Sequence, residues 1–385
     1  MRKNLFALFA TLMVASMVLS ACGGGAAATP STNSSGDTAL AAGSVQINGA
    51  GATFPLPIYT EWTYAYQFVD PAVIVNYEGI GSGGGKKAII DGTVDFAGSD
   101  SLVSDEEYAA GKDLQMYPTV AGAEVMIYNI PELDPASDPV LIFDRQTLVD
   151  IYLGKVTTWN DPEIVATNPS VASKLPNQPI VVAHRSDGSG TTEIFTRALT
   201  SFSADWKAAV GDPGYGTSIE WPVAKSNPTN DVGGKGNQGV AAAVQNTPYA
   251  IGYVELNYAV ANNLAYAQFV NKAGKTVSAN ADSLQSAMSD FANSFTDRLT
   301  NVIVDGPGDG TWPIAGYTYL VLHQTSMKDC VKAQKLLEYI KWTETDPAAA
   351  KRATDLGYAT LPPTVRDQVL AKLGEVTCNG QPVMK

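Results

Sequence analysis

From residue 44 onwards, short runs of β-branched and other apolar residues alternate with stretches whose apolar positions recur every three or four residues. The first pattern is typical of buried strands and the second of amphipathic helices. Strands are predicted over 45–48, 73–77, 94–97, 180–184, 251–254 and 317–322. Helices are predicted to follow Pro57, Ser82, Ser104, Asp144 and Ser189, and another to occupy 328–343. The alternation favours an α/β fold with a mostly parallel sheet flanked by helices.

Two of the predicted helices carry further local signals. After Pro57, one helical face collects apolar side chains at the spacing of an amphipathic helix. They are Ile58, Trp62, Ala65, Tyr66 and Val69. Ser104 and Glu107 have the spacing of a capping box at the start of the third helix. Residues 221–239, in contrast, are rich in Gly, Asn and Pro without a period, and are predicted to form a loop.

The first 22 residues have a different character. Arg2 and Lys3 precede an apolar stretch that is too short and too interrupted for an ordinary membrane span. The segment resembles a bacterial lipoprotein signal, which implies removal of residues 1–21 and attachment of lipid to Cys22. An uncleaved helix or a plain secretory signal is the alternative. Residues 22–43 contain almost no bulky apolar side chain and are predicted to be a flexible tether.

The charge and length of the remaining chain restrict the kinds of ligand and the number of lobes to be expected. Loss of Arg2 and Lys3 changes the formal charge from −13 to −15, which argues against nucleic acid and against a broadly basic funnel for anions. The roughly 340 residues after the tether suggest two lobes, at 100–200 residues per domain. In an oxidising compartment Cys330 and Cys378 can form a disulfide or remain two buried thiols, and spacing does not decide between these states.

Two glycine-rich turns carry the first chemical signal. Residues 79–85 and 186–192 each end a predicted strand and open a predicted helix. A helix N-terminus offers free backbone N–H groups and partial positive charge, and glycine allows a ligand to approach the main chain. The pair therefore predicts that an oxyanion is held between two lobes.

Two more turns add polar groups to this prediction. The turn over 49–55 offers the Thr53 hydroxyl and the Phe54 N–H, and the strand over 94–97 leads to Asp100. The glycine-rich turns add Ser82 and a group that contains a guanidinium. That group is Arg185, Ser189, the Gly190 N–H and Thr191. Many neutral donors, one guanidinium and one acid would surround the anion.

This constellation resembles the phosphate-binding protein of the bacterial high-affinity phosphate transporter. The resemblance covers almost the whole chain after the tether, and further stretches carry it. They are 150–155 (DIYLGK), 233–237 (GGKGN), 250–255 (AIGYVE) and 312–314 (WPI). Two features depart from the family: Gly83 stands where a second serine is frequent, and residues 221–239 are longer than the usual loop.

The resemblance implies a two-lobed α/β fold like that of periplasmic binding proteins, with the ligand cleft between the lobes. Lobe 1 would comprise 44–128 and 318–385, and lobe 2 would comprise 129–317. The implied phosphate ligands are Thr53, Phe54, Ser82, Asp100, Arg185, Ser189, Gly190 and Thr191. Asp187 would orient Arg185. The protein would be an exported, lipid-anchored monomer, periplasmic or on the outer face of the membrane, that delivers phosphate to an ABC-type permease without a cofactor or metal.

The presence of Asp100 among the predicted ligands can be tested against the chemistry of phosphate. A carboxylate repels an anion unless the ligand brings a proton and donates it in a short hydrogen bond. Phosphate is protonated near neutral pH and sulfate is not, so Asp100 would reject sulfate. On spacing alone, Asp100 is better explained as a residue that caps a turn. With Ser82, Arg185 and Ser189 in the same sequence, the role in phosphate binding becomes the better explanation.

Several enzyme classes fit the same motifs less well. The Gly79-x-Gly81-x-x-Gly84 pattern matches a dinucleotide fingerprint, but it follows the second predicted strand of an exported protein. A phosphate-loop nucleotidase would need Ser or Thr where Lys87 stands. His184, Asp187 and Ser189 are too crowded in one turn to act as a hydrolase triad. The remaining alternative is a metal-free phosphate-ester hydrolase on the same scaffold.

Overall fold

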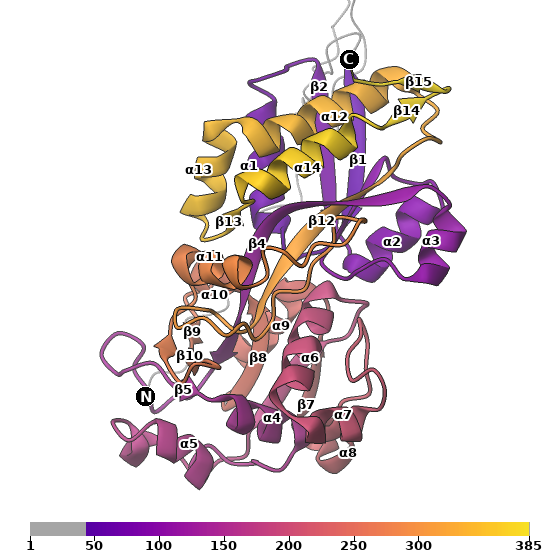
Figure 1. The fold of residues 1–385 in the computed structure, drawn as a ribbon. Helices are drawn as coiled ribbons and strands as arrows, with labels where there is room; N and C mark the ends of the chain where they lie inside the picture. Colours follow the sequence, from indigo (N-terminus) through magenta and orange to yellow (C-terminus); the bar gives the residue numbers. More distant parts are fainter. Residues whose placement is uncertain (1–43, 385) are drawn as a thin grey trace, which may run out of the picture. The chain divides into compact units, whose positions relative to one another are not determined.

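The computed structural model describes residues 44–384, in which one long, mixed sheet runs through the molecule (Figure 1). Along the sheet the strands follow the order β2-β1-β3-β12-β4-β8-β6-β7. Their bounds in that order are Val73–Gly79, Val45–Gly51, Phe96–Ser99, Ala315–His323, Leu114–Tyr128, Ala250–Glu255, Val181–Arg185 and Asp231–Gly234. Two short strands, β9 (Ala265–Tyr266) and β13 (Ala359–Thr360), also pair with β4.

Helices accompany each end of this sheet. Those that belong with β1, β2 and β3 are α1 (Leu56–Tyr66), α2 (Ser82–Ile90), α3 (Asp105–Gly111), α12 (Cys330–Thr345), α13 (Pro347–Asp355) and α14 (Pro363–Leu373). Those at the other end are α4 (Arg145–Leu153), α5 (Pro162–Thr167), α6 (Gly190–Phe202), α7 (Ala204–Val210), α8 (Pro222–Ser226) and α9 (Gly236–Asn246). Near the middle, α10 (Leu256–Ala261) and α11 (Ala281–Asp290) contact β4. Small sheets comprise β5 (Ile142–Phe143), β10 (Gln268–Val270) and β11 (Thr276–Val277), and β14 (Thr377–Cys378) with β15 (Gln381–Pro382).

The sheet is parallel at its ends and antiparallel in its middle. β1 is parallel to β2 and β3, and β6 is parallel to β7 and β8. The central strands β12 and β4 run antiparallel to each other and to their outer neighbours. The α/β class is therefore confirmed, whereas the expectation of a mostly parallel sheet holds only for its two ends.

Strand β4 belongs to both halves of the sheet. Residues 114–123 pair with β12, and residues 124–128 pair with β8. All its residues are buried, so they show no alternation of polar and apolar positions, and Pro118 and Gly122 interrupt the apolar run. For this reason the pattern does not predict the longest strand of the fold. The lobe boundaries at 128 and 318 stay a prediction.

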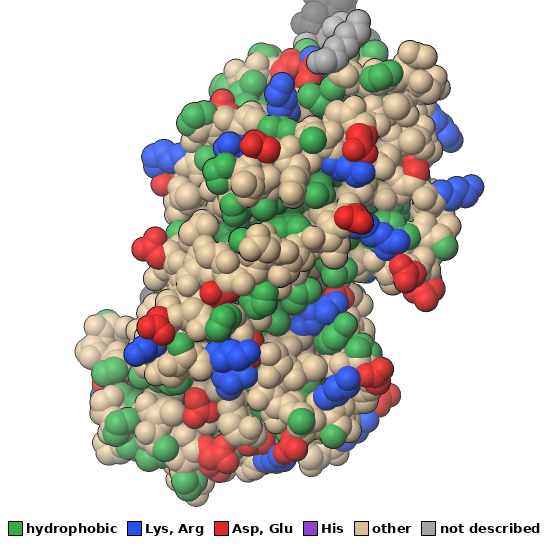
Figure 2. Space-filling view, in the orientation of Figure 1, with side chains coloured by type: hydrophobic (Ala, Val, Ile, Leu, Met, Phe, Trp, Pro, Cys, Tyr) green, Lys and Arg blue, Asp and Glu red, His purple; other side chains and the backbone are tan. Residues whose placement is uncertain are grey.

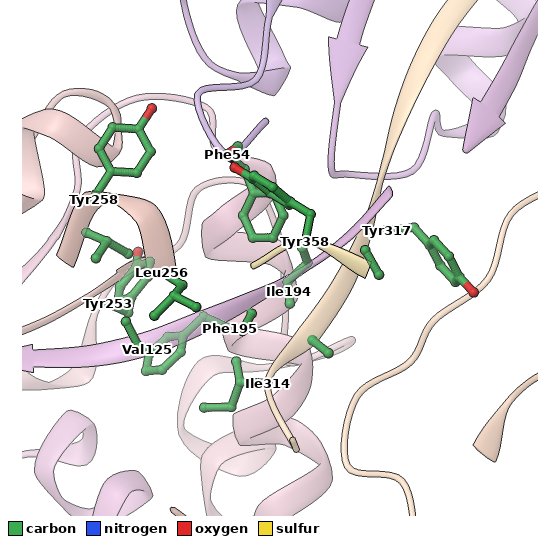
Figure 3. Close-up of a cluster of buried hydrophobic side chains, with 14 of the residues drawn as sticks. Phe54, Val125, Ile194, Phe195, Tyr253, Leu256, Tyr258, Ile314, Tyr317 and Tyr358 are labelled. Carbon is green, nitrogen blue, oxygen red and sulfur yellow. Dashed lines mark hydrogen bonds between the residues drawn. The ribbon is translucent and has the colours of Figure 1, made fainter. Parts of the chain in front are cut away.

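Aromatic side chains from distant segments form a continuous core next to the central strands (Figure 3). Phe195 of α6 stacks on Tyr253 of β8, with ring centroids 4.3 Å apart. Phe54 and Tyr358, more than three hundred positions apart, meet edge to face at 6.5 Å. This packing ties the turn after β1 to the C-terminal part of the chain.

Several local predictions can be compared with the structure. The capping box of Ser104 and Glu107 is present at α3. The disulfide, one of the two states left open, joins Cys330 and Cys378. The apolar face of α1 is buried as expected except at Val69, which is 54% exposed because the helix already ends at Tyr66.

The prediction of a loop over 221–239 is wrong. The segment contains α8, a 3-10 turn at Pro228–Asn230, β7 and the start of α9. Trp221 is buried among the aromatic rings of Tyr152, Phe195 and Trp206. Up to β7 these elements are three to five residues long, which is too short to show a period in the sequence.

Cys22 and the tether lie outside the described residues. Within 44–384, no helix is long and apolar enough to cross a membrane.

Candidate functional site

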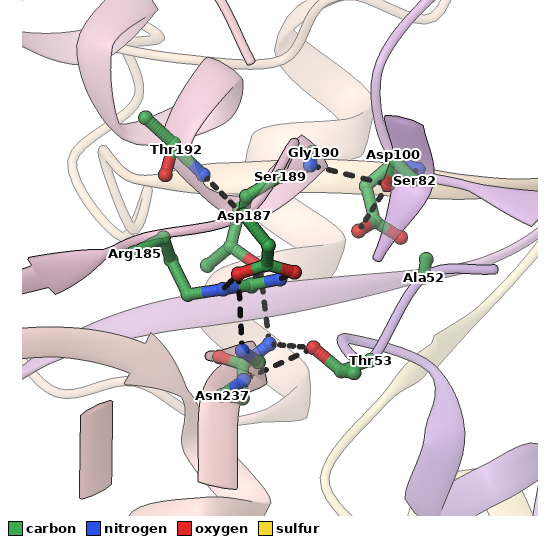
Figure 4. Close-up of polar contacts among 12 residues, drawn as sticks. Ala52, Thr53, Ser82, Asp100, Arg185, Asp187, Ser189, Gly190, Thr192 and Asn237 are labelled. Carbon is green, nitrogen blue, oxygen red and sulfur yellow. Dashed lines mark hydrogen bonds and ion pairs between the residues drawn. The ribbon is translucent and has the colours of Figure 1, made fainter. Parts of the chain in front are cut away.

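The candidate site forms where the carboxyl ends of the parallel strands meet (Figure 4). Thr53 follows β1, Ser82 follows β2, and Asp100 follows β3. Arg185 ends β6, and Asn237 follows β7. The carboxyl ends of parallel strands are the usual place for ligands in α/β proteins. The fold thereby gathers side chains that lie up to 184 positions apart, as in the contact of Thr53 with Asn237.

The N-termini of α2 and α6 approach each other through glycine. The Gly83 N–H donates to the Gly188 carbonyl at 3.0 Å. A Cβ on Gly83 would lie 3.2 Å from the Gly188 Cα, and a Cβ on Gly190 would lie 2.5 Å from the Ser82 Oγ. The absence of side chains at these positions therefore lets the two turns touch. It also gives a local reason for glycine at position 83.

The Ser82 hydroxyl joins three segments. Its Oγ accepts the N–H groups of Asp100 and Gly190, both at 3.1 Å, and it donates to Asp100 Oδ2 at 3.3 Å. In α6, the Ser189 Oγ caps the helix by accepting the Thr192 N–H at 3.0 Å. Because a serine hydroxyl can accept and donate at once, the Ser189 proton is available to a further acceptor.

Arg185 is buried and held by Asp187. Its Nε and NH2 groups donate to the two carboxylate oxygens of Asp187 at 2.7 and 2.6 Å. Burial acts to raise the pKa of Asp187, but the hydrogen bonds and charge of Arg185 outweigh it and the pKa is lowered. The remaining nitrogen, NH1, points at the Thr191 Oγ1, 3.2 Å away. The guanidinium is therefore oriented toward the residues that open α6.

The turn after β1 is fixed through its carbonyl groups. Tyr258 donates its hydroxyl to the Thr53 carbonyl at 2.5 Å, and Tyr358 donates to the Phe54 carbonyl at 2.8 Å. In a trans peptide the N–H points away from the preceding carbonyl. The Phe54 N–H therefore points away from Tyr258.

Asn237 is a site residue that the sequence interpretation did not include. It is fully buried, and its side-chain amide donates to the hydroxyls of Thr53 at 2.9 Å and Thr191 at 3.1 Å. Its backbone N–H also reaches Thr53, and its Oδ1 accepts the Glu255 N–H at 2.9 Å. The glycine-rich stretch over 233–237 was a signal for it, since glycine lets the chain come close to the site.

Asp100 is a buried carboxyl with few charged neighbours. Its Oδ1 accepts the Thr318 hydroxyl at 2.7 Å. Thr318 lies opposite Val120, next to the register shift between Thr318 and Tyr319 in the pairing of β12 with β4. Burial raises the pKa of Asp100 to about 7, although the hydrogen bonds of Thr318 and Ser82 and the charge of Arg185 oppose the shift.

Together these groups suit a small tetrahedral oxyanion. Hydroxyls, backbone N–H groups and one guanidinium supply donors from several directions, which matches an anion with several oxygens. The surface does not add a broad positive field: on the face in Figure 2, Lys and Arg side chains are interspersed with Asp and Glu. In residues 44–384, no group of three or more His, Cys, Asp and Glu is placed to hold a metal ion.

The comparisons with known proteins agree with this chemistry. The sequence matches the PBP superfamily domain over residues 29–346. It is 37% identical to the phosphate-binding protein PstS of Pasteurella multocida, covering 85% of this chain and 89% of that one. The PstS protein of Methanocaldococcus jannaschii is 34% identical, covering 94% and 92%.

Among solved structures, the phosphate-binding protein of Stenotrophomonas maltophilia aligns with a TM-score of 0.62. The two share 22% identity, with 85% of this chain and 94% of that chain covered. At this identity the likeness shows the fold alone. The expected two-lobed binding-protein fold and the family resemblance are confirmed, and the roles assigned to individual site residues stay predictions.

The pKa of Asp100 is open to direct measurement. In carbon-13 NMR its carboxyl should titrate at about pH 7, with Asp187 in the same spectra titrating below its ordinary pKa of 3.8. Because the folded protein binds this proton more tightly than the unfolded chain, the group's contribution to stability falls between about pH 4 and pH 7 and is constant above. An Asp100 carboxyl that remains ionised at about pH 5 would contradict the assignment.

Proposed function

This chain belongs to the phosphate-binding proteins of the PBP superfamily, and we propose that it binds inorganic phosphate at the candidate site for import through an ABC-type permease. One observation carries the proposal. Two glycine-lined helix N-termini and an oriented Arg185 converge on Ser82 and Asp100, in a chain whose relatives are named for phosphate binding.

The proposed ligands come from each segment of the site. They are the Thr53 hydroxyl, the Phe54 N–H, Ser82, Asp100, Arg185, Ser189, the Gly190 N–H and Thr191. Asn237 supports them by holding two of the hydroxyls in place. When phosphate binds, hydrogen bonds that these groups make with one another would be replaced by hydrogen bonds to the phosphate oxygens. The Gly190 N–H, for instance, would turn from the Ser82 Oγ to the ligand.

Asp100 would select the protonation state of the ligand. An ionised Asp100 accepts the proton of hydrogen phosphate in a charge-assisted hydrogen bond. Sulfate has no proton to donate, so Asp100 would face it as an unpaired buried acceptor, which is costly. This explains how an acid favours phosphate in a site built for anions.

We propose that the two lobes close on phosphate as a hinge and that the closed monomer docks on the permease subunits. Phosphate shifts the lobes toward closure because it contacts both of them, and such differential contact is what a ligand needs to shift a conformational equilibrium. The direct contact between Gly83 and Gly188 would stabilise the closed state without involving the ligand.

For localisation, we propose export followed by anchoring through lipid on Cys22. The proposal rests on the sequence pattern of residues 1–22, which lie outside the described part of the chain. Two or more acyl chains give stable membrane attachment, whereas one alone is marginal. The tether over 22–43 would then let the binding domain reach the permease.

The protein is a binding component rather than an enzyme. The relatives that it matches over most of both chains are named as phosphate-binding proteins, and the alternative of a phosphate-ester hydrolase finds no support among them.

Phosphate binding and the role of Arg185 are tested together by calorimetry. The protein should bind phosphate, and Arg185→Ala should weaken binding by about 1.5–3 kcal/mol because a charge-assisted contact is lost. Arg298→Ala is the matched control, since Arg298 pairs with Asp105 at the surface. Unchanged affinity in Arg185→Ala would remove Arg185 from the proposed ligands, and no phosphate binding by the unmodified protein would refute the function.

Selectivity tests the role of Asp100. Asp100→Asn replaces an acceptor with an amide that can also donate, so the ratio of phosphate affinity to sulfate affinity should fall. The ratio should be measured at constant pH and ionic strength. Asp95→Asn serves as the control, since Asp95 directly precedes β3, as Asp100 directly follows it, and pairs with Lys332. A ratio equal to that of the unmodified protein would assign the discrimination to donor placement instead.

The anchor is tested by Cys22→Ser. Because the tether contributes no core, the variant should fold and bind phosphate but leave the membrane fraction. Retention of the variant on membranes after a salt wash would show that lipid at Cys22 is not the anchor.

A further inference from the structure

Glu124 is a buried acid that the site described above does not use. It lies in β4 at the point where the strand leaves β12 and begins to pair with β8. Its side chain is fully buried, and neither carboxyl oxygen has a hydrogen-bond partner among the described residues. Its main chain, in contrast, is satisfied: the N–H donates to the Ile314 carbonyl and the carbonyl accepts the Trp312 indole N–H, both at 2.9 Å.

The neighbouring strand connects Glu124 to the site. Glu124 lies directly opposite Glu255 in the antiparallel pair of β4 and β8, which places the two side chains on the same face of the sheet. Glu255 is also buried, and its carboxylate accepts the backbone and side-chain N–H groups of Asn257 at 3.0 and 2.9 Å. Its own N–H is held by Asn237, the residue that contacts Thr53 and Thr191.

The face of β4 that carries Glu124 looks toward the turn after β1. Gly122 lies two residues earlier and therefore on the same face. A Cβ on Gly122 would lie 2.5 Å from the Phe54 ring and 3.2 Å from the Tyr358 ring. Glu124 thus belongs to the layer beneath Phe54, whose N–H is one of the proposed phosphate donors.

Within residues 44–384, no free cation balances Glu124 in this layer. The charged groups that influence it are Asp100, Glu255 and Arg185, and Arg185 is already paired with Asp187. The other titratable side chains nearby are tyrosines with raised pKa values: Tyr152, Tyr253, Tyr258 and Tyr358. Burial, and after it the charge of Asp100, raises the pKa of Glu124 well above its ordinary value. An unpaired buried carboxylate is costly, so the neutral acid is the stable form.

We propose that Glu124 is a positioning residue that tunes phosphate binding. When its carboxyl is protonated and neutral, the site can bind the phosphate dianion. When the carboxyl loses its proton, its negative charge repels the dianion. The proposal rests on the proposed function. It follows that phosphate binding favours the protonated form of Glu124. At a pH at which Glu124 is partly ionised in the free protein, binding of phosphate would draw a proton from solution onto this carboxyl.

The test compares the unmodified protein with Glu124→Gln, which fixes the neutral state. Phosphate affinity is measured by calorimetry from about pH 6 to pH 10, in pairs of buffers with different ionisation heats that report proton uptake. Phosphate, Asp100 and Glu255 titrate in both proteins, so the difference between the two reports Glu124 together with its electrostatic coupling to the other two acids. Affinity should fall more steeply with pH in the unmodified protein, by up to about tenfold per pH unit for one coupled proton.

Glu344→Gln is the matched control. Glu344 of α12 also has a buried carboxyl oxygen without a partner and a pKa raised by burial, but Arg366 is its charged neighbour rather than the site residues. This variant should keep the pH dependence of the unmodified protein. Glu124→Leu, whose folding is checked by thermal unfolding, should behave like Glu124→Gln and replaces it if the unpaired amide prevents folding.

Infrared difference spectra give a second readout. At alkaline pH, addition of phosphate should produce a protonated-carboxyl band in the unmodified protein that is absent from Glu124→Gln. Equal pH slopes and equal proton uptake in the two proteins would overturn the proposal while leaving phosphate binding intact. Absence of phosphate binding in all variants and in the unmodified protein would refute the proposed function instead.

Discussion

In the proposed binding site, the positive charge is already neutralised by a neighbouring carboxylate before any anion binds. Arg185, its one guanidinium, is held by two hydrogen bonds to Asp187. The incoming anion must therefore be stabilised by oriented dipoles and hydrogen bonds rather than by a net positive charge. Helix N-termini and hydroxyl groups supply such dipoles, but they act only over short distances, within the first turn of the helix. The geometry of the site has to be tight because the net charge provides so little.

That tightness explains why glycine stands where the two turns meet. Gly83 and Gly188 touch through their main chains, and Gly190 approaches the Ser82 hydroxyl so closely that a Cβ would overlap it. The strands behind the turns hold this contact in place. β4 pairs with β12 over its first part and with β8 over its last, so one continuous backbone spans both halves of the sheet. Every residue of this strand is buried.

The parts of the site that sequence reasoning could find are those whose chemistry is local. Ser82 and Ser189 lie at the start of helices that follow strands, so short motifs were sufficient to select them. Asp100 directly follows β3 and was selected only in combination with Ser82, Arg185 and Ser189. Asn237 was missed because β7 and α8 before it are too short to show a period. Glu124 could not be selected at all, since its position opposite Glu255 depends on the register of two strands more than a hundred residues apart. The disulfide of Cys330 with Cys378 required the same kind of information.

The buried acids give an acidic protein a way to bind one oxyanion in preference to another. A site with surplus cations would attract any dianion of suitable size, because Coulomb attraction does not depend on where the ligand carries its protons. Hydrogen bonding does depend on where the ligand carries its protons. A carboxylate accepts a hydrogen bond from a protonated ligand oxygen but repels an oxygen that has no proton, and a neutral acid can donate as well as accept. Burial raises the pKa of Asp100 to about 7 and the pKa of Glu124 well above its ordinary value. In the proposed site, selectivity would follow from the number of protons shared between protein and ligand.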